Sequence, residues 1–334
     1  MTNLNVSVLG GGSWGTTVAA LVTRNVPVTL WARNPATVDE INTRHTNETY
    51  LPGAKLPDKL IATNDIGEAA HDADVIVMGI PSQNFRAVLE EVKKHIRAWV
   101  PVISLTKGLE LNSMKRMTEV ITEVLPGHPV GVLTGPNLAR EIIAGQAAAS
   151  VIAMEDEIIV RELQALFHSG LFRTYTNTDL IGCELGGVLK NIIAIAVGMG
   201  DGQGAGDNTR SALITRGLSE ITRLGVAMVG RPETFAGLAG MGDLIATCTS
   251  AQSRNRHVGL ELGKGRSIDA IIDEMVMVAE GVKSAPTVVA LGKKYGIEMP
   301  ITNDVYSVLQ GEKSPRQIFR GLLQSTVGAE SEPG

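Results

Sequence analysis

Residues 6–22, VSVLGGGSWGTTVAALV, contain the clearest chemical pattern in this sequence. The glycines fit the dinucleotide-binding pattern G-x-G-x-x-G at Gly10, Gly12 and Gly15. The same stretch fits the nucleophile elbow G-x-S-x-G of the α/β-hydrolases, with Ser13 as the nucleophile. One interpretation predicts a loop that holds a pyrophosphate, and the other predicts a serine that attacks an ester.

The position of this loop in the chain favours the nucleotide. Only one predicted strand precedes it, whereas a nucleophile elbow normally follows several strands. In a dinucleotide-binding domain the glycine loop lies at the first strand-to-helix turn. There Gly10 would make the tight turn, Gly12 would let the backbone approach the pyrophosphate, and Gly15 would let helix and strand pack closely. The alternative is a glycine-rich turn that binds nothing.

The end of the second predicted strand bears on which cofactor is bound. NAD-binding domains usually place Asp or Glu there to bind the ribose 2′-hydroxyl, and NADP-binding domains place Arg nearby. In VTLWARNP the strand is followed by Arg33, and the first carboxylate is that of Asp39. Unless Arg33 is only a solvated surface residue, it predicts contact with a 2′-phosphate. We therefore expect NADP(H) as the preferred cofactor, with NAD(H) as the alternative.

Polar residues and turn formers follow three further predicted strands. Pro81 and Ser82 follow VMGI, and Lys107 follows ISLT. Gly135 opens the turn after VLT, where Asn137 could cap a helix. Because ligands bind at the carboxyl ends of such strands, we expect these residues to face one crevice. A lone lysine is most often solvated, but this location favours a role for Lys107 in the site.

Lys190 lies in the apolar sequence GGVLKNIIAIAVGMG. Lysine is rare in so apolar a helix, and the neighbouring sequence offers little charge to pair with it. Burial beside a second cation such as Lys107 would favour the neutral amine, which could exchange a proton near neutral pH. The alternative is a lysine at a helix edge whose charged end reaches solvent.

The passage GMGDLIATCTSAQSRNRHVG brings polar residues into a short Gly- and Ser-containing segment. Arginine together with Ser and Asn is a suitable set for binding a phosphate, unless the passage is an ordinary polar loop. Its candidate residues are Asp243, Ser253, Arg254, Asn255 and Arg256.

Several other catalytic motifs are missing from the sequence. No tyrosine is followed by Lys at the fourth position, as the short-chain dehydrogenases require. There is no H-E-x-x-H and no Cys/His cluster, so no metal site is expected. The sequence GLELGKG lacks the spacing and the Ser/Thr of a P-loop.

The elements that must position these residues predict an α/β fold. Short apolar strands alternate with helical patterns at 14–24 and 83–97, which is typical of a doubly wound, mostly parallel Rossmann-type sheet. The predicted strands are 5–9, 27–31, 74–80, 101–106, 129–134 and 149–154.

The second part of the chain has few strand-like runs and predicts an all-helical domain. We therefore expect a nucleotide-binding domain at 1–179, a helical substrate-binding and catalytic domain at 180–328, and a disordered tail at 329–334. The helices expected in the second domain are 180–200, 209–229, 267–282 and 285–296.

The composition suits a globular protein of two domains. Of 334 residues, 44% are hydrophobic and 19% charged, and the net charge of −5 gives no reason to expect nucleic acid or an anionic membrane as a partner. Two cysteines do not make a disulfide framework, which suits the cytoplasm. The N-terminus does not resemble a signal peptide, and the apolar runs fall short of the ~20 residues of a membrane span.

The ordered motifs together resemble a known family. GGGSWGTTVA, TKGLE, TGPNLAREI, LGGVLKNIIAIAVGMGDG, TRGLSEI, GLAGMGDLIATCTSAQSRNRHVG and VAEGV are similar to the bacterial NAD(P)-dependent glycerol-3-phosphate dehydrogenases, from residue 6 to about residue 300. The resemblance implies reversible reduction of dihydroxyacetone phosphate to sn-glycerol 3-phosphate for phospholipid synthesis.

The same resemblance implies roles for individual residues. Lys190 matches the proton acceptor in alcohol oxidation, and Lys107 and Asp243 belong to the same catalytic set. Asn137 departs from the family, which usually has Ser or Thr there. Substrate contacts are implied for Lys107, Gly135, Asn137, Lys190, Asp243, Ser253, Arg254 and Asn255. Cofactor contacts, in addition to the three glycines, are implied for Ser13, Trp14, Arg33, Lys107, Ala139, Arg254, Val278 and Glu280.

Three other functions remain to be weighed. A β-hydroxyacid or 6-phosphogluconate-type dehydrogenase would need a group that binds a carboxylate, whereas QSRNR favours a phosphate. A module that only senses NADP(H) would need no buried Lys190, and a hydrolase would need Ser13 as nucleophile. A homodimer built through the helical domain is also considered, although no particular residue predicts it.

Overall fold

The computed structural model describes residues 4–275 and 277–322. The tail expected to be disordered, 329–334, lies outside the described residues. The chain divides into two compact units.

Each unit is made from two separate segments of the chain. One unit holds the chain up to Lys107 together with Lys115–Leu180, and the other holds Gly108–Met114 together with the chain from Ile181 on. Leu109 shows why the short segment belongs to the second unit, since it is completely buried in the hydrophobic core of the helices. The sequence contains no signal for this exchange.

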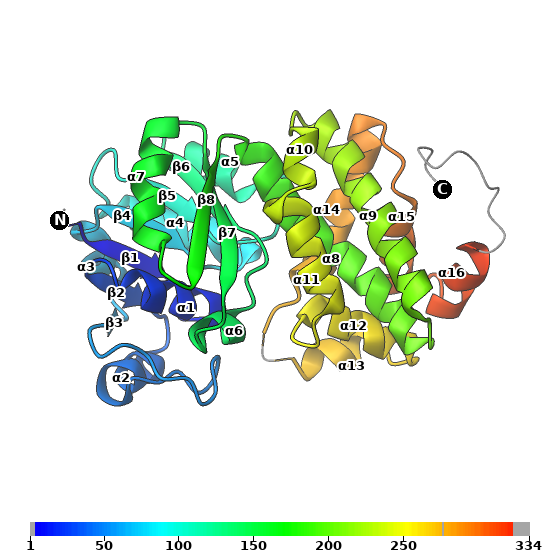
Figure 1. Ribbon diagram of the computed structural model, residues 1–334, viewed down its shortest axis with the longest axis horizontal. Helices are drawn as coiled ribbons and strands as arrows, with labels where there is room; N and C mark the ends of the chain where they lie inside the picture. Colours follow the sequence, from blue (N-terminus) through cyan, green and yellow to red (C-terminus); the bar gives the residue numbers. More distant parts are fainter. Residues whose placement is uncertain (1–3, 276, 323–334) are drawn as a thin grey trace. The chain divides into compact units, whose positions relative to one another are not determined.

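The first unit is built on one sheet of eight strands within the described residues (Figure 1). The strand order is β3-β2-β1-β4-β5-β6-β7-β8. Strands β1 to β6 are parallel, while β7 runs antiparallel to β6 and parallel to β8. The order of the first six strands is that of dinucleotide-binding domains, and the predicted mostly parallel sheet is confirmed. The strands are β1 (Val6–Leu9), β2 (Val28–Trp31), β3 (Ile61–Thr63), β4 (Val75–Met78), β5 (Val102–Ser104), β6 (Val130–Thr134), β7 (Ala148–Met154) and β8 (Phe172–Asn177).

Helices cover both faces of this sheet because the central strands are apolar on both sides. In β4, Val75 and Val77 pack into a core on one face of the sheet, while Ile76 and Met78 pack into a second core on the other face. Side chains alternate along a strand, so an uninterrupted apolar run must be buried twice. The helices of this unit are α1 (Ser13–Val22), α2 (Pro35–Arg44), α3 (Ile66–His71), α4 (Ser82–Lys93), α5 (Met117–Val124), α6 (Ala139–Ile143) and α7 (Glu157–Phe167).

Two strands were not predicted, and both lie at the edges of the sheet. β3 is only three residues long, and its first residue, Ile61, is exposed. In β8 the buried Phe172 and Thr174 alternate with the exposed Arg173 and Tyr175. An edge strand needs no continuous apolar run, so a search for such runs does not find it.

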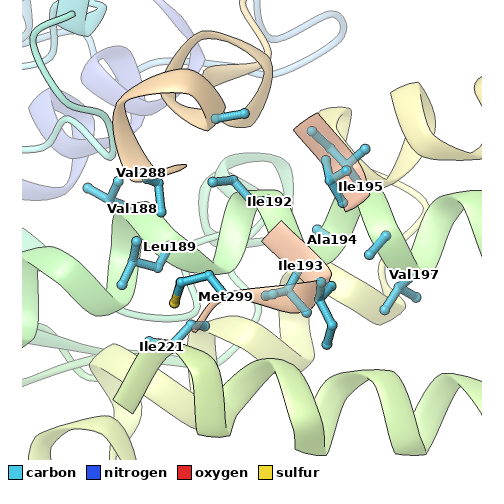
Figure 2. Packing of buried hydrophobic residues seen from close by; sticks show 14 of the residues in the cluster. Val188, Leu189, Ile192, Ile193, Ala194, Ile195, Val197, Ile221, Val288 and Met299 are labelled. Carbon is cyan, nitrogen blue, oxygen red and sulfur yellow. The ribbon is translucent and has the colours of Figure 1, made fainter. Parts of the chain in front are cut away.

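From Ile181 on, the described residues of the second unit form helices joined by loops. Its centre is α8, whose side chains make a core with the helices around it (Figure 2). Val188, Ile192 and Ile195 of α8 are buried together with Ile221 of α9 and Val288 of α14. The helices are α8 (Leu180–Gly202), α9 (Asp207–Ala227), α10 (Pro232–Phe235), the π-helix η1 (Leu238–Gly242), α11 (Asp243–Thr249), α12 (Arg254–Gly263), α13 (Ile268–Asp273), α14 (Glu280–Tyr295), α15 (Pro300–Leu309) and α16 (Pro315–Leu322).

Helix α8 corrects the expectation that every apolar run is too short for a membrane. It has 23 residues and is the one helix in the described chain that is long and apolar enough to cross a bilayer. However, 94% of its most apolar stretch is buried inside the protein. Burial of this extent identifies α8 as the core helix of a helical domain.

The helix predicted at 267–282 is wrong, because the chain leaves the helical path between α13 and α14. Arg254 donates a hydrogen bond of 2.8 Å to the carbonyl oxygen of Val278, and Asn255 accepts one of 3.0 Å from the amide of Gly281. In a continuous helix these main-chain groups would bond to the helix itself. A tertiary contact with α12 therefore replaces helical bonds that the local sequence would allow.

Candidate active site

The glycine loop joins β1 to α1 and shows why three of its positions are glycine. Gly10 has φ of +127°, and a Cβ atom there would lie 2.4 Å from the carbonyl oxygen of Gly79. A Cβ atom on Gly15 would lie 2.0 Å from the carbonyl oxygen of Gly10. A Cβ atom on Gly12 would have nothing within 4 Å. Gly10 and Gly15 are thus required for packing, while Gly12 leaves open space beside the backbone.

This open space lies at the N-terminus of α1, as a pyrophosphate site requires. Gly12 is the N-cap of the helix, with no side-chain cap and no acidic residue in the first turn. The helix begins at Ser13, followed by the partly buried Trp14. The residues therefore fit an anion held by main-chain N–H groups and the helix dipole.

Asn47 holds this loop through hydrogen bonds and was not predicted. Its buried side-chain amide donates to the carbonyl oxygen of Gly11 at 2.9 Å and to the hydroxyl of Thr16 at 3.0 Å. Asn47 follows α2 by three residues, and no local pattern connects it with the loop. Only the fold reveals that this residue fixes the shape of the glycine turn.

Arg33, the residue expected at the 2′-phosphate, follows β2. Arg33 is exposed and comes two residues after β2, directly before the N-cap Asn34 of α2. Asp39 is exposed on α2. The position of Arg33 is open to a ligand at the carboxyl end of β2, as a contact with a 2′-phosphate requires.

Residues at the ends of β5 and β6 meet at the same edge of the sheet. The ammonium of Lys107 donates to the carbonyl oxygen of Gly135 at 2.8 Å. Gly135 has φ of +128°, which a residue with a side chain rarely adopts. Pro81 and Ser82 lie at the end of β4, where Ser82 is buried and begins α4.

Asn137 does not cap a helix, which corrects the sequence-based expectation. Leu138 is the N-cap of α6, and Ala139 is its first residue. The amide of Asn137 donates to Ser150 at 3.1 Å, and the Ser150 hydroxyl donates to the carbonyl oxygen of Thr134 at 2.7 Å. The other polar atom of Asn137, Oδ1, is buried with no hydrogen-bond partner among the described residues. A buried acceptor without a partner is available for a ligand donor.

In the helical unit, Lys190 lies in a cluster of three side chains. Its ammonium donates to Asp243 Oδ1 and to Thr247 Oγ1, each at 2.5 Å. The side chains of Lys190 and Asp243 are 6% and 2% exposed. The expectation that little charge lies near Lys190 is therefore wrong, because the carboxylate is supplied by α11, 53 residues later in the chain. A buried ammonium requires such a partner.

The three members of this cluster are placed by two helices. Asp243 and Thr247 are four residues apart and lie on the same face of α11. The π-helix η1 immediately precedes Asp243, and π-turns are frequent at functional sites. Thr247 was not predicted, although its spacing from Asp243 is a signal that could have found it.

The QSRNR passage forms the start of α12. Ser253 is the N-cap, and its hydroxyl accepts from the amide of Arg256 at 3.2 Å. The side chain of Asn255 donates to that of Asn191 at 3.0 Å. Asn191 was not predicted, and it directly follows Lys190. The start of α12 is therefore tied to the turn of α8 that holds Lys190.

Arg254 lies close to the remaining predicted residues of the helical unit, Val278 and Glu280. Its bond to the carbonyl oxygen of Val278 places it beside the start of α14, whose first residue is Glu280. Arg254 is exposed as a residue, yet desolvation by the surrounding protein lowers the pKa of its guanidinium, and the charge of Glu280 opposes this shift. Arg254 remains a cation, as a phosphate ligand needs to be.

Comparison with known proteins gives the family. A family model described as the N-terminus of NAD-dependent glycerol-3-phosphate dehydrogenase matches residues 5–160, and one described as its C-terminus matches residues 179–320. The chain belongs to this family.

Two relatives and one solved structure match over nearly their whole length. A glycerol-3-phosphate dehydrogenase of Sphingopyxis alaskensis, named as NAD(P)+-dependent, is 72% identical over 331 residues, which is 99% of both chains. One from Mycobacterium avium with the same cofactor in its name is 51% identical over 99% of this chain and 97% of its own. The crystal structure of glycerol-3-phosphate dehydrogenase from Coxiella burnetii has a TM-score of 0.92 at 38% identity and covers 96% of this chain and 99% of its own.

Membership of the family makes this chain an NAD(P)-dependent oxidoreductase, and it decides against the hydrolase. Within the described residues no group of three or more His, Cys, Asp or Glu side chains could hold a metal ion. The individual site residues remain predictions, supported here by their placement in each unit.

Proposed function

We propose that this dehydrogenase reduces dihydroxyacetone phosphate to sn-glycerol 3-phosphate, and catalyses the reverse reaction, with Lys190 as the general acid and base. The observation that supports this most directly is the buried cluster of Lys190, Asp243 and Thr247. A module that only bound a nucleotide would not need the buried ammonium of Lys190, which is hydrogen-bonded to Asp243 and Thr247. The product would supply phospholipid synthesis.

The cofactor in this proposal is held by the glycine loop of residues 1–179. When bound, a nicotinamide cofactor supplies the hydride for the carbonyl carbon. Gly12 leaves room for the pyrophosphate, and the first turn of α1 with Ser13 and Trp14 offers main-chain donors. We assign the 2′-phosphate to Arg33, so that NADP(H) is preferred and NAD(H) is also used. Further contacts are assigned to Lys107, Ala139, Arg254, Val278 and Glu280.

Substrate contacts are assigned in each unit separately. Arg254 is the cation for the phosphate, and Ser253 and Asn255 offer hydrogen bonds beside it. Lys107, Gly135 and Asn137 are assigned to the substrate from the sheet, with the unpartnered oxygen of Asn137 accepting from a substrate hydroxyl.

Lys190 performs the proton transfer in this mechanism. As negative charge develops on the carbonyl oxygen, its ammonium stabilises that oxygen and then gives it a proton. In the reverse direction the amine accepts the proton of the alcohol. Asp243 and Thr247 keep the lysine in one orientation, because each accepts one of its hydrogen bonds.

The setting of the enzyme is part of the proposal. We place it in the cytoplasm with a small-molecule substrate, supported by two buried cysteines that are not disulfide-bonded and by a net charge of −5. A homodimer through the helical domain is a further expectation.

The reaction is tested by the absorbance of the reduced nicotinamide ring in the presence of dihydroxyacetone phosphate, with NADPH and NADH in parallel. Loss of absorbance with this ketone is expected, faster with NADPH at limiting cofactor. Binding of NADPH without any turnover would contradict the substrate assignment and point to hydroxyacids, which would then be tried as their oxo forms.

A further inference from the structure

Asp201, near the end of α8, is a buried carboxylate that holds two arginines. Its side chain is 7% exposed. Oδ1 accepts from Nε and Nη2 of Arg210 at 3.1 and 2.8 Å. Oδ2 accepts from Nε of Arg256 at 2.8 Å, and Nη2 of Arg256 lies 2.6 Å away. Each oxygen therefore serves one guanidinium, with two nitrogens on each side.

The two arginines belong to different helices. Arg210 lies in the first turn of α9, where it also contacts the exposed Asp207 at 2.5 Å. Arg256 lies in the first turn of α12, one residue after Asn255 and two after Arg254. The sequence suggested Arg256 itself for phosphate binding. In the structure, Nε and Nη2 of its guanidinium bind Asp201.

The main chains of α8 and α12 touch beside this pair. A Cβ atom on Gly198 would lie 2.1 Å from the carbonyl oxygen of Arg256, and one on Gly259 would lie 2.1 Å from that of Ile195. These glycines set the distance between the helices. Distance alone does not prevent α12 from sliding or rotating, and specific side-chain bonds are needed to fix its first turn.

Two such bonds exist, and they are made by the two residues that follow Arg254. Asn255 bonds to Asn191, next to Lys190, and Arg256 bonds to Asp201 on the same helix. Asn191 and Asp201 lie on α8, the buried helix that also holds Lys190. The two bonds therefore fix the start of α12 relative to Lys190.

We propose that Asp201, acting through Arg256, is a positioning residue that holds Arg254 and Asn255 in the register needed to bind the substrate phosphate. The inference rests on the proposed function, since it concerns the phosphate of that substrate. Arg210 serves the other oxygen of the same carboxylate and acts on α9, so it does not share this role.

The two arginines provide a matched test. Arg256→Gln and Arg210→Gln each remove one guanidinium from the same buried carboxylate. For both variants and the wild type, kcat/KM is measured with dihydroxyacetone phosphate and with dihydroxyacetone, which lacks the phosphate. KM for NADPH and the thermal unfolding midpoint are measured as well.

Loss of a charged hydrogen bond predicts that Arg256→Gln lowers kcat/KM for dihydroxyacetone phosphate by about 10- to 100-fold, mainly through KM. With dihydroxyacetone both variants stay within about threefold of the wild type, because no phosphate is present to be misplaced. Both glutamine variants are expected to unfold at a lower temperature than the wild type. Arg210→Gln is expected to keep the wild-type ratio of kcat/KM for dihydroxyacetone phosphate to kcat/KM for dihydroxyacetone. Arg256→Lys retains one charged donor to Asp201 and is expected to restore part of the loss; it also serves if the glutamine variant does not fold.

Equal effects of the two glutamine variants on both ketones would show a purely structural role and overturn the inference. Unchanged discrimination in Arg256→Gln and Arg256→Lys would overturn it as well. If the wild type reduced neither ketone while binding NADPH, the proposed function would fail, and the inference with it, which separates that result from the first two.

Discussion

At the scale of single residues, the chemistry depends on one buried cation and its carboxylate. Lys190 and Asp243 are each nearly inaccessible, and neither charge could remain in this environment alone. Removing one partner therefore affects stability as well as catalysis, and any test of Lys190 has to separate the two effects.

Lys190→Ala is expected to lower kcat by a factor of about 10² to 10⁴, the usual size of a general acid-base contribution, with the affinity for NADPH little changed. The variant also leaves Asp243 buried without its cation. We would therefore measure the double variant Lys190→Met with Asp243→Asn, which removes both charges. Its stability should recover relative to Lys190→Ala while kcat stays low; near-normal turnover in either variant would exclude Lys190 from the mechanism.

Arg33→Asp is expected to weaken the binding of NADPH far more than that of NADH, because the 2′-phosphate loses a cation and meets a like charge. Dissociation constants for both cofactors from fluorescence titration measure the difference. Arg24→Asp is the matched control, since Arg24 is also exposed but follows the C-terminal end of α1. Equal losses for both cofactors in Arg33→Asp would mean that Arg33 does not contact the 2′-phosphate.

At the scale of elements, two glycines of the strand-to-helix turn after β1 are needed for different reasons, Gly15 for packing and Gly12 for binding. Gly15 is glycine because the carbonyl oxygen of Gly10 leaves no room for a Cβ atom. Gly12 is not limited by the protein, since its φ of −75° suits any residue and nothing lies within 4 Å of the Cβ position. A requirement for glycine at this position would come from the ligand alone.

Gly12→Ala should therefore leave the unfolding free energy within about 1 kcal/mol of the wild type. It should weaken NADPH binding clearly, because the added methyl group occupies the pyrophosphate position. Gly15→Ala should cost about 1–3 kcal/mol through overpacking. Chemical denaturation and NADPH titration of both variants give the two numbers. Full NADPH affinity in Gly12→Ala would place the pyrophosphate elsewhere.

At the scale of the whole molecule, the helical unit has an extensive core that includes Cys248, and the second cysteine, Cys183 of α8, is buried as well. Cys183 and Cys248 are each inaccessible, and burial raises the pKa of the Cys248 thiol to about 12. Raising the pKa keeps the thiol protonated across the neutral range, whereas an unfolded chain would ionise it at its ordinary value.

Alkylation of both cysteines by a neutral reagent should thus require opening of the unit, at a rate far below that of the denatured chain and with a similar rate at the two sites. Adding glycerol 3-phosphate should slow the reaction by mass action, if it binds the folded unit. Mass spectrometry after timed labelling gives both rates. Rapid labelling of Cys248 in the native protein at neutral pH would contradict the burial that raises its pKa.

Local sequence was sufficient for features that depend on neighbouring residues. The glycine loop, the apolar strands buried on both faces and the long helices follow from short-range pattern, because turn geometry and side-chain periodicity are properties of adjacent residues. The two edge strands were missed, since β3 is very short and β8 alternates between buried and exposed side chains. From the ordered motifs the family could be identified, and the family comparison confirmed it.

Tertiary structure decided what depends on residues far apart in the chain. Nothing near Lys190 in sequence indicates that Asp243 and Thr247 would meet it, and nothing near Asp201 indicates Arg256. The break between α13 and α14 depends in the same way on Arg254 and Asn255 of another helix. Such contacts form only when packing brings separate helices together, and buried charges and main-chain groups then find partners that no local pattern specifies.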